Sequence, residues 1–377
     1  MKIKTITCHN VYNYGASLQA HALMFHLSEL GHDVEVIDYM PDYIRKHVSI
    51  WDIGPRWKKN IITRLAYYCY VVPQRLCQKE SRNRFDSFTN EHLRLTRRYN
   101  SIAELREDIP DADVFFCGSD QIWNPTINNG LDPAFYLDFA SDKSVKASYA
   151  ASFSVSTLND QDCGFIAGML KKLDYISVRE KTGLSIIKSL KIGKDAVNVL
   201  DPVFLPPLEH WISMTYTPTI RDYILVYDQE DSKTIKEIAL KLSQKTHKKI
   251  IAFKGLHGRR YADIKIRQSG PIDFISIIAH ADYVVTNSFH CSAFSIIFSR
   301  DFYVVPRDHQ KVNSRMADLL DALNIQGHMV NSADTLDDGI TGIEYEAVNE
   351  KLSSLRESSY NYIEMVLSNA QHRASKK

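Results

Sequence analysis

Short apolar strands alternate with amphipathic helices along most of the chain, and this order restricts the fold more than any other feature. Residues 2–7 alternate as a strand does and lead into a polar loop, after which the apolar period becomes helical and stops at Gly31. Residues 34–38 then supply a second strand. A strand, a helix and a second strand in this order form a βαβ unit with a parallel sheet, so the sequence predicts an α/β fold.

The alternation occurs in two series. The predicted strands of the first series continue at residues 113–117, 145–152, 175–178 and 197–200, and those of the second lie at 223–227, 249–253, 283–285 and 302–305. Between the series lies the proline-rich segment 201–207, and the loosely patterned residues 208–221 after it favour a hinge. The sequence therefore predicts two Rossmann-like domains that face each other across a cleft. The expected units are an N-terminal domain at 1–207, a C-terminal domain at 208–345 and a helical tail at 346–377.

The composition bounds the class of protein. A chain of 377 residues, 44% of them hydrophobic, is long enough for two cores, and its formal net charge of +1 argues against a nucleic-acid-binding protein. The six cysteines have neither a C-x-x-C pair nor zinc-like spacing, which fits reduced thiols in a cytosol. Since the sequence shows no signal-peptide core and no apolar run of membrane-spanning length, we expect a cytoplasmic protein that at most touches a membrane. No cluster of metal ligands is visible, so we expect neither a metal nor a cofactor.

Residues 41–100 differ from the rest of the N-terminal half. The pattern there is helical, with 13 lysines and arginines against 5 aspartates and glutamates. Aromatic residues, among them Trp51 and Trp57, lie between these basic residues. Basic residues interleaved with aromatic ones suit a membrane surface or a large anionic acceptor. The alternative is a solvated helical insertion whose aromatic side chains pack on the body of the protein.

Polar loops follow the first strand and the strand at 113–117, at the sheet edge where α/β proteins bind ligands. The candidate binding residues of the two loops are Asn13, Tyr14, Gly15, Ser119, Asp120, Gln121, Trp123 and Asn124. Packing does not require so much hydrogen-bonding chemistry at 118–125, which favours a site there. The loop at 10–15 is equally well explained as a plain connection.

Other strand ends carry further candidates. Ser152 ends a strand of small residues, which would let a ligand approach closely. Arg179 follows the strand at 175–178, where a guanidinium can hold a carboxylate or a phosphate through two hydrogen bonds. A structural contact of Arg179 with Glu180 or with a helix end is the alternative.

His290 opens a helix directly after the strand at 283–285, and Asn287 and Ser288 come just before it. The free N–H groups and the dipole of a helix start favour an anion, so His290 stands where an anionic substrate is expected. The alternative is that His290 only caps its helix.

Six motifs occur in register along the chain, and together they carry a family resemblance. They are NYGASLQA at 13–20, GSDQIWN at 118–124, SYAASF at 148–153, VRE at 178–180, DPV at 201–203 and TNSFH at 286–290. With this set the chain resembles the polysaccharide pyruvyl transferase family over nearly its whole length. The resemblance implies a fold similar to the two-domain GT-B glycosyltransferases. It also implies transfer of pyruvate from phosphoenolpyruvate to a sugar as a ketal, during the synthesis of bacterial surface or capsular polysaccharide on lipid carriers.

The resemblance also implies roles for single residues. Arg179 matches the arginine that holds phosphoenolpyruvate in the family, and His290 matches the histidine of the second domain. Family members tend to have another arginine two residues before that histidine, and this chain has Ser288 there. Lys254 and Arg307, each at the end of a strand of the second series, are the predicted replacements.

Formation of a pyruvate ketal requires a proton donor to the methylene carbon of the donor substrate. Histidine exchanges protons near neutral pH, and a nearby anion favours its charged form, so His290 suits the role of acid. Arg179, with Lys254 or Arg307, would neutralise the carboxylate and the phosphate. Asp120 would orient or deprotonate the acceptor hydroxyl.

Two other functions suit the same architecture. A glycosyltransferase that uses a nucleotide sugar is the first, although Glu344, Glu346 and Glu350 lack the eight-residue glutamate spacing typical of the retaining enzymes. A two-domain protein that binds saccharide without catalysis is the second. Consumption of phosphoenolpyruvate distinguishes the predicted activity from both.

Overall fold

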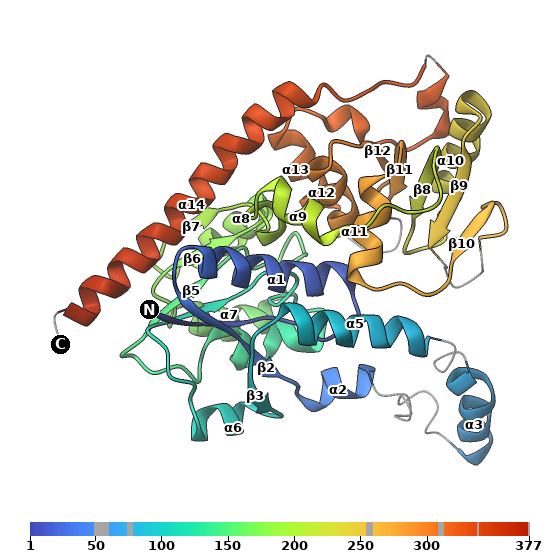
Figure 1. Ribbon diagram of the computed structural model, residues 1–377. Helices are drawn as coiled ribbons and strands as arrows, with labels where there is room; N and C mark the ends of the chain where they lie inside the picture. Colours follow the sequence, from blue (N-terminus) through green and yellow to red (C-terminus); the bar gives the residue numbers. More distant parts are fainter. Residues whose placement is uncertain (49–59, 74–77, 254–258, 308–312, 338, 376–377) are drawn as a thin grey trace.

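The computed structural model describes residues 1–48, 60–73, 78–253, 259–307, 313–337 and 339–375. Two five-stranded parallel sheets form the centres of two domains, as the alternation predicts (Figure 1). The N-terminal sheet has the order β3-β2-β1-β4-β5 and the C-terminal sheet has the order β10-β9-β8-β11-β12. In both sheets the first strand of the domain lies in the middle, which is the arrangement of a Rossmann-like fold.

The N-terminal sheet consists of β1 (Lys2–Ile6), β2 (Asp33–Tyr39), β3 (Leu95–Tyr99), β4 (Val114–Cys117) and β5 (Val145–Ser148). Two short strands, β6 (Ile176–Val178) and β7 (Ala196–Asn198), pair with each other, and single bridges such as Ala151 to Val178 continue the sheet toward them. The C-terminal sheet consists of β8 (Tyr223–Tyr227), β9 (Lys249–Phe253), β10 (Ile264–Ile266), β11 (Tyr283–Thr286) and β12 (Asp301–Val304).

The helices of the N-terminal domain are α1 (Tyr14–Glu29), α2 (Asp42–Val48), α3 (Ile61–Ala66), which continues into the π-helical turn η2 (Tyr67–Val71), α5 (Lys79–His92), α6 (Ile102–Glu107), α7 (Asp160–Leu170) and α8 (Lys181–Ser189). The later helices are α9 (Leu208–Met214), α10 (Lys233–Thr246), α11 (Pro271–Ala279), α12 (Phe289–Ile297), α13 (Ser314–Ala322) and α14 (Tyr345–Ser375). Among the described residues, no helix combines the length and the apolar character needed to cross a membrane.

The segment 41–100 differs from the expectation that it is helical. It ends in β3, which pairs with β2 at the edge of the sheet. Arg97 and Arg98 are exposed on this edge strand, so the charged residues hide the apolar alternation in the sequence. Helix α5, in contrast, packs its buried Phe85 and Phe88 onto the body of the protein.

The proline-rich segment between the domains is more tightly packed than a hinge should be. Residues 202–205 are fully or almost fully buried, and α9 follows them. The indole of Trp211 in α9 is completely buried, donates a hydrogen bond to the carbonyl oxygen of Val203 and meets the ring of Phe294 edge-on. The hinge at 208–221 stays a prediction, although the first part of this segment forms the regular helix α9, whose buried Trp211 completes a core.

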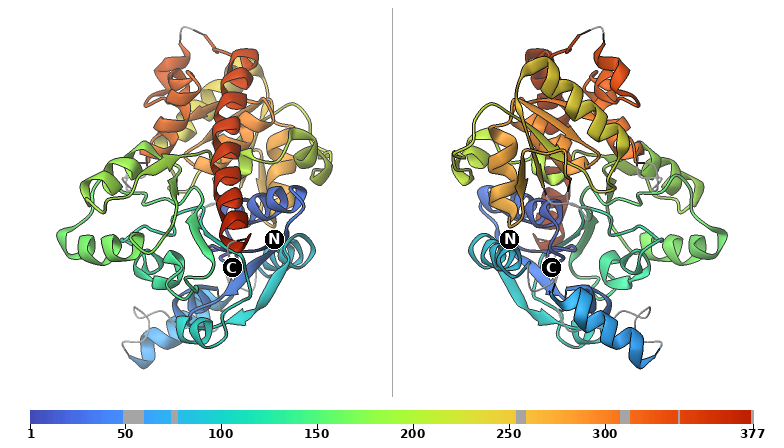
Figure 2. Two further views of the ribbon diagram at one scale, coloured as in Figure 1. Left: turned by 90° about the vertical axis from the view of Figure 1, so that its left-hand side faces the viewer. Right: turned by 90° about the vertical axis from the view of Figure 1, so that its right-hand side faces the viewer.

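One hydrophobic core crosses the domain boundary. It joins Leu18 and Ala22 of α1 to Phe274 of α11 and Phe294 of α12. Helix α14 crosses the boundary as well, and Figure 2 shows it running from the C-terminal domain back to the N-terminal one, where the two chain ends lie near each other. Its first half belongs to the shared core, and its second half covers the N-terminal sheet, where the hydroxyl of Tyr362 donates to the carbonyl oxygen of Ser148.

Candidate functional site

The candidate site lies where helix starts of both domains meet. Gly15 is in the first turn of α1, and the ring of His290 in the first turn of α12 lies directly against it. Arg179 immediately precedes the start of α8, and Arg315 is the second residue of α13. The starts of four helices, α1, α8, α12 and α13, therefore meet in one region, and their positive dipole ends favour a bound anion there.

Asp201 is the centre of this region. Its Oδ2 atom lies 2.5 Å from Nη1 of Arg179, 3.7 Å from Nε2 of His290 and 3.1 Å from the hydroxyl of Ser119. Burial by itself would raise the pKa of Asp201, but the charges of His290 and Arg179 outweigh burial and lower the pKa below its usual value. Asp201 thus stays ionised and lies between a side chain of each domain, Arg179 and His290. Its position at the end of a predicted strand, before Pro202, was the signal that would have identified it.

Arg179 is fixed more firmly than the sequence predicts. Its side chain is completely buried, and Nη2 lies 3.0 Å from Oδ1 of Asp120 in addition to the contact with Asp201. The guanidinium also lies over the ring of Phe289 from α12, with Cζ 4.7 Å from the centroid. Burial lowers the pKa of an arginine, but Asp201 and Asp120 outweigh it and raise that of Arg179. Arg179 is therefore a permanent, oriented positive charge at the domain boundary.

Asp120 has a backbone conformation that is uncommon for residues other than glycine. Its φ angle is 63°, in the left-handed region that aspartate tolerates better than most residues. Burial would raise the pKa of Asp120, but Arg179, His290 and Arg315 outweigh burial and lower it. A carboxylate with a lowered pKa is a weak base, so the structure favours orientation of a hydroxyl over its deprotonation by Asp120.

His290 fits into a space that exists only because residue 15 is glycine. A Cβ atom at Gly15 would lie 2.0 Å from Nδ1 of His290. The histidine side chain is 10% exposed, and its Nε2 has no hydrogen-bond partner among the described residues. The ring thus lies with Nδ1 toward Gly15 and with the buried Nε2 toward Asp201.

Arg315 is a site residue that the sequence analysis missed. It is 95% buried, its Nη1 lies 3.9 Å from Oδ1 of Asp120, and its Cζ lies 5.7 Å from the centroid of the Phe289 ring. Burial and the charge of Arg179 lower the pKa of Arg315 to about 10, so it is charged at neutral pH. Nothing in its local sequence marks it, because it follows no strand directly and only the fold brings α13 to this place.

Several predicted binding residues have contacts that shape the loops around the site. Asn13 caps α1 by accepting from the amide of Ala16, and the Tyr14 ring stacks on Phe274 of the other domain, with centroids 4.6 Å apart. Ser152 donates to Oε1 of Glu180. The hydroxyl of Ser119 reaches the carbonyl oxygen of Ala150 and Asp201. Direct contact of these side chains with a substrate stays a prediction.

The loop after β4 is held mainly by its own hydrogen bonds. Trp123 is completely buried and donates to the carbonyl oxygen of Phe135, which makes its indole part of the N-terminal core. Asn124 donates to the side-chain oxygen of Gln121 and accepts from Thr126. These three predicted binding residues build the loop that carries Asp120, and their contact with a ligand stays a prediction.

In the C-terminal domain, Asn287 is buried, donates to Asp228 and accepts from the amide of Gln229. Ser288 is the N-cap of α12 and accepts from the amide of Cys291. Arg307 is half-buried and donates from Nε to the carbonyl oxygen of Asn287. Lys254, the other predicted replacement cation, lies outside the described residues.

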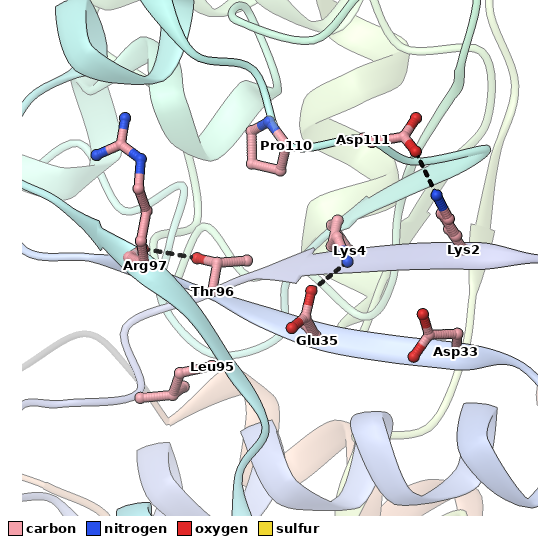
Figure 3. Close-up of a pocket in the computed structure, with 9 residues that line it drawn as sticks. All are labelled: Lys2, Lys4, Asp33, Glu35, Leu95, Thr96, Arg97, Pro110 and Asp111. Atoms are coloured by element: carbon pink, nitrogen blue, oxygen red, sulfur yellow. Dashed lines mark hydrogen bonds and ion pairs between the residues drawn. The ribbon is translucent and has the colours of Figure 1, made fainter.

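A cavity of about 420 Å³ elsewhere does not resemble a binding site (Figure 3). It lies along the N-terminal sheet near the amino ends of β1 and β2, away from the carboxyl edge where such sheets bind ligands. Lys2 pairs with Asp111 and Lys4 pairs with Glu35 across it, so these charges compensate each other.

Fold and site together define a two-domain α/β protein with GT-B-like architecture and a buried cluster of charges at the domain boundary. A putative UDP-N-acetylglucosamine 2-epimerase from Listeria monocytogenes has a similar structure, with a TM-score of 0.52 at 10% identity, over 97% of this chain and 90% of that one. The UDP-GlcNAc 2-epimerase from Neisseria meningitidis bound to UDP-GlcNAc gives 0.50 at 11% identity, over 97% and 94%. At such low sequence identities, the similarity shows a common fold but says nothing about activity or substrate.

The sequence defines the family. The model of the polysaccharide pyruvyl transferase family matches residues 13–309, which covers all six motifs, and the chain belongs to this family. The predicted resemblance and the predicted GT-B-like fold are thereby confirmed. No curated protein matches the chain.

Proposed function

We propose that the protein transfers pyruvate from phosphoenolpyruvate to two hydroxyl groups of a sugar, as a cyclic ketal, during the synthesis of bacterial surface or capsular polysaccharide. Membership of the pyruvyl transferase family supports the transfer. One observation supports the donor: Arg179 and His290 approach the same oxygen of Asp201 from different domains. A fixed cation and a titratable proton donor in one place suit an anion that must be protonated on carbon.

In the proposed reaction, a proton is added to the methylene carbon of phosphoenolpyruvate, which becomes a methyl group. The cationic carbon next to it is attacked by one sugar hydroxyl, and the carbon–oxygen bond to phosphate breaks. A second hydroxyl attacks the same carbon, and each hydroxyl gives up its proton. The products are one ketal and one inorganic phosphate, so atoms and charge balance without an oxidant or a metal step.

His290 supplies the first proton in this scheme. Its Nε2 is without a hydrogen-bond partner among the described residues and lies 3.7 Å from Oδ2 of Asp201. Arg179 offsets the negative charge of the donor, and the helix starts of α1 and α12 add their dipoles. Asp120 orients the acceptor hydroxyl as a hydrogen-bond acceptor.

We further propose that the acceptor is a lipid-linked glycan and that the reaction takes place in the cytoplasm, at the inner face of the membrane. Exposed apolar side chains on α3 and η2 support contact with a lipid surface. They are Ile61, Ile62, Leu65 and Tyr68.

Release of inorganic phosphate from phosphoenolpyruvate tests the proposal. Purified protein should release phosphate only when a suitable acceptor is present, and a panel of galactose-, glucose- and mannose-terminated glycosides identifies it. Turnover that requires a nucleotide sugar instead would indicate a glycosyltransferase. Saccharide binding without phosphate release under any condition would indicate a non-catalytic binding protein.

A further inference from the structure

Arg315 differs from Arg179, the other arginine of the cluster, in its lack of a close partner among the described residues. Its nearest recorded acceptor, Oδ1 of Asp120, is 3.9 Å from Nη1, which is too long for a hydrogen bond. Its Nε atom is buried without a hydrogen-bond partner among the described residues. Arg179, by contrast, has hydrogen bonds of 2.5 and 3.0 Å to two carboxylates.

A buried guanidinium without hydrogen bonds is unfavourable, because water no longer solvates the charge and no acceptor replaces the water. The ring of Phe289 offsets only a part of this cost, since a cation over an aromatic face gains little compared with a paired ion. The position is therefore poorly explained by folding alone. It is well explained if an anion occupies the site during function.

We propose that Arg315 binds an anionic group of the donor, and that it supplies the second cation which the sequence lacks at Ser288. The identification of this anion as phosphoenolpyruvate rests on the proposed function, whereas the anion site itself does not. The planar guanidinium offers several N–H donors, which suits the oxygens of a phosphate or a carboxylate.

The charges around the site support this assignment. The side chains of Glu180 and Asp201 are completely buried beside Arg179, and that of Asp120 is 20% exposed. An incoming anion would be repelled by these carboxylates if Arg179 acted alone, because two of them already accept hydrogen bonds from it. A second cation that is not yet hydrogen-bonded is what the site needs to attract an anion.

Arg307 is the alternative second cation, since the sequence predicted it. It is half-buried and its Nε donates to the carbonyl oxygen of Asn287, whereas Arg315 lies next to Asp120 and Phe289 in the cluster itself. The two arginines give different outcomes in a binding experiment, because only the residue that contacts the anion should change its affinity strongly.

Calorimetric titration of the full-length protein with phosphoenolpyruvate and, separately, with inorganic phosphate tests the proposal. Arg315→Met removes the charge at nearly the same volume, and we expect it to weaken binding of both ligands by roughly tenfold to a hundredfold, as loss of a charge-assisted hydrogen bond does. Arg315→Lys keeps the charge and should restore part of the affinity. Arg300→Met is the matched control, because Arg300 is half-buried and lies beyond the opposite end of α12.

The outcomes separate the two proposals. Unchanged affinity in Arg315→Met, with a circular dichroism spectrum and melting temperature like those of Arg300→Met, would overturn the role of Arg315, and a large loss in Arg307→Met alone would transfer the role to Arg307. Wild-type protein that binds phosphate through Arg315 but shows no preference for phosphoenolpyruvate would contradict the donor and keep the anion site. If Arg315→Met fails to fold, Arg315→Lys decides through the ratio of the Michaelis constant for the donor to the turnover number.

Discussion

His290 and Arg179 contact the same oxygen of Asp201, but they contribute different things to the site. His290→Gln keeps a hydrogen-bonding side chain without the exchangeable proton, so turnover should fall by roughly 10²- to 10⁴-fold while donor affinity changes little. Arg179→Lys keeps the charge but loses the two-pronged hydrogen bonding to Asp201 and Asp120. It should weaken donor binding and also destabilise the fold by about 1–3 kcal/mol, because a buried carboxylate loses a partner.

Steady-state kinetics with phosphoenolpyruvate as the varied substrate, together with thermal melts, measure both effects. Normal turnover in His290→Gln would contradict the proposed role of His290 as the acid. An Arg179→Lys enzyme with unchanged donor affinity and an unchanged melting temperature would show that the observed ion pairs have no importance.

We expect a substitution of Gly15 to change turnover only by displacing the ring of His290. In Gly15→Ala the new methyl group would overlap the His290 ring, so the ring must move and turnover should fall at least tenfold, while the helix gains the usual preference for alanine of about 0.5–1 kcal/mol. Gly164→Ala in α7 is the matched control, because an added Cβ there meets no atom within 4 Å. Equal activity of the two variants would contradict the placement of His290.

Among single residues, the sequence identifies as site candidates those that come soon after a predicted strand. Arg179 and His290 were found in this way, and the structure brings them together. Asp201 was passed over although it ends a strand, and Arg315 could not be found because its place depends on how the domains pack. Trp123 shows that a polar-looking loop can contain a residue that serves the core, and its contact with a ligand stays a prediction.

The α3–η2 element presents an apolar surface that the rest of the protein does not cover. Ile61, Ile62 and Leu65 are between 59% and 75% exposed, and Arg64 lies among them. We expect this element to bind anionic lipid, because burial of such side chains is favourable and the segment 41–100 is basic. Replacement of the three apolar residues by asparagine should lower binding to phosphatidylglycerol vesicles by about tenfold or more.

Co-sedimentation with vesicles measures this binding, and Ile212→Asn serves as the control because Ile212 is 52% exposed on α9. Added salt should weaken the attraction, since it screens the charges. Equal sedimentation of all variants, or equal binding to neutral vesicles, would contradict the prediction. Arg56, Lys58 and Lys59, which the sequence also places in the basic segment, lie outside the described residues.

Helix α1 carries a histidine that should make stability depend on pH. His21 lies 2.9 Å from the carbonyl oxygen of His92 and 2.9 Å from Nε2 of His210, and burial lowers its pKa to about 4. Between about pH 6.5 and pH 4, His21 is therefore protonated in the unfolded chain but neutral in the folded protein. Because the unfolded state binds the extra proton, stability falls as the pH falls through this range. The loss at pH 5 relative to pH 7 should be about 1–2 kcal/mol.

Urea unfolding at the two pH values measures this loss. His21→Phe should be less stable at pH 7, because it loses two hydrogen bonds, but its stability should decline less on acidification. His372→Gln, on an exposed part of α14, should keep the wild-type pH dependence. An identical decline in wild type and His21→Phe would show that the proton is bound elsewhere.

Among the elements, the sequence predicts those with a clean apolar period. The central strands β1, β4, β8 and β11 were all found. The edge strand β3 was missed because its adjacent exposed arginines break the alternation, and the edge strand β10 was missed because it has only three residues. Helix α9 was not predicted, because its few apolar residues, Trp211 above all, pack against residues distant in sequence.

Besides the site, the shared core and helix α14 connect the two domains. Lys181 at the start of α8 adds an ion pair to Asp321 of α13, with Nζ and Oδ2 2.8 Å apart. Arg179 and Arg315 are buried between the domains, so a donor must gain access by a relative movement of the domains or of these side chains. Assembly of the site from both domains then couples donor binding to closure.

The fate of the carbon atoms of phosphoenolpyruvate tests the central claim most directly. We expect donor labelled with ¹³C at its second carbon to give an acceptor glycoside that carries the label at a quaternary ketal carbon, with one phosphate released for each label transferred. Nuclear magnetic resonance and mass spectrometry of the isolated product read out both. Label found only in free pyruvate or in unreacted donor, with every acceptor of the panel unmodified, would contradict the account.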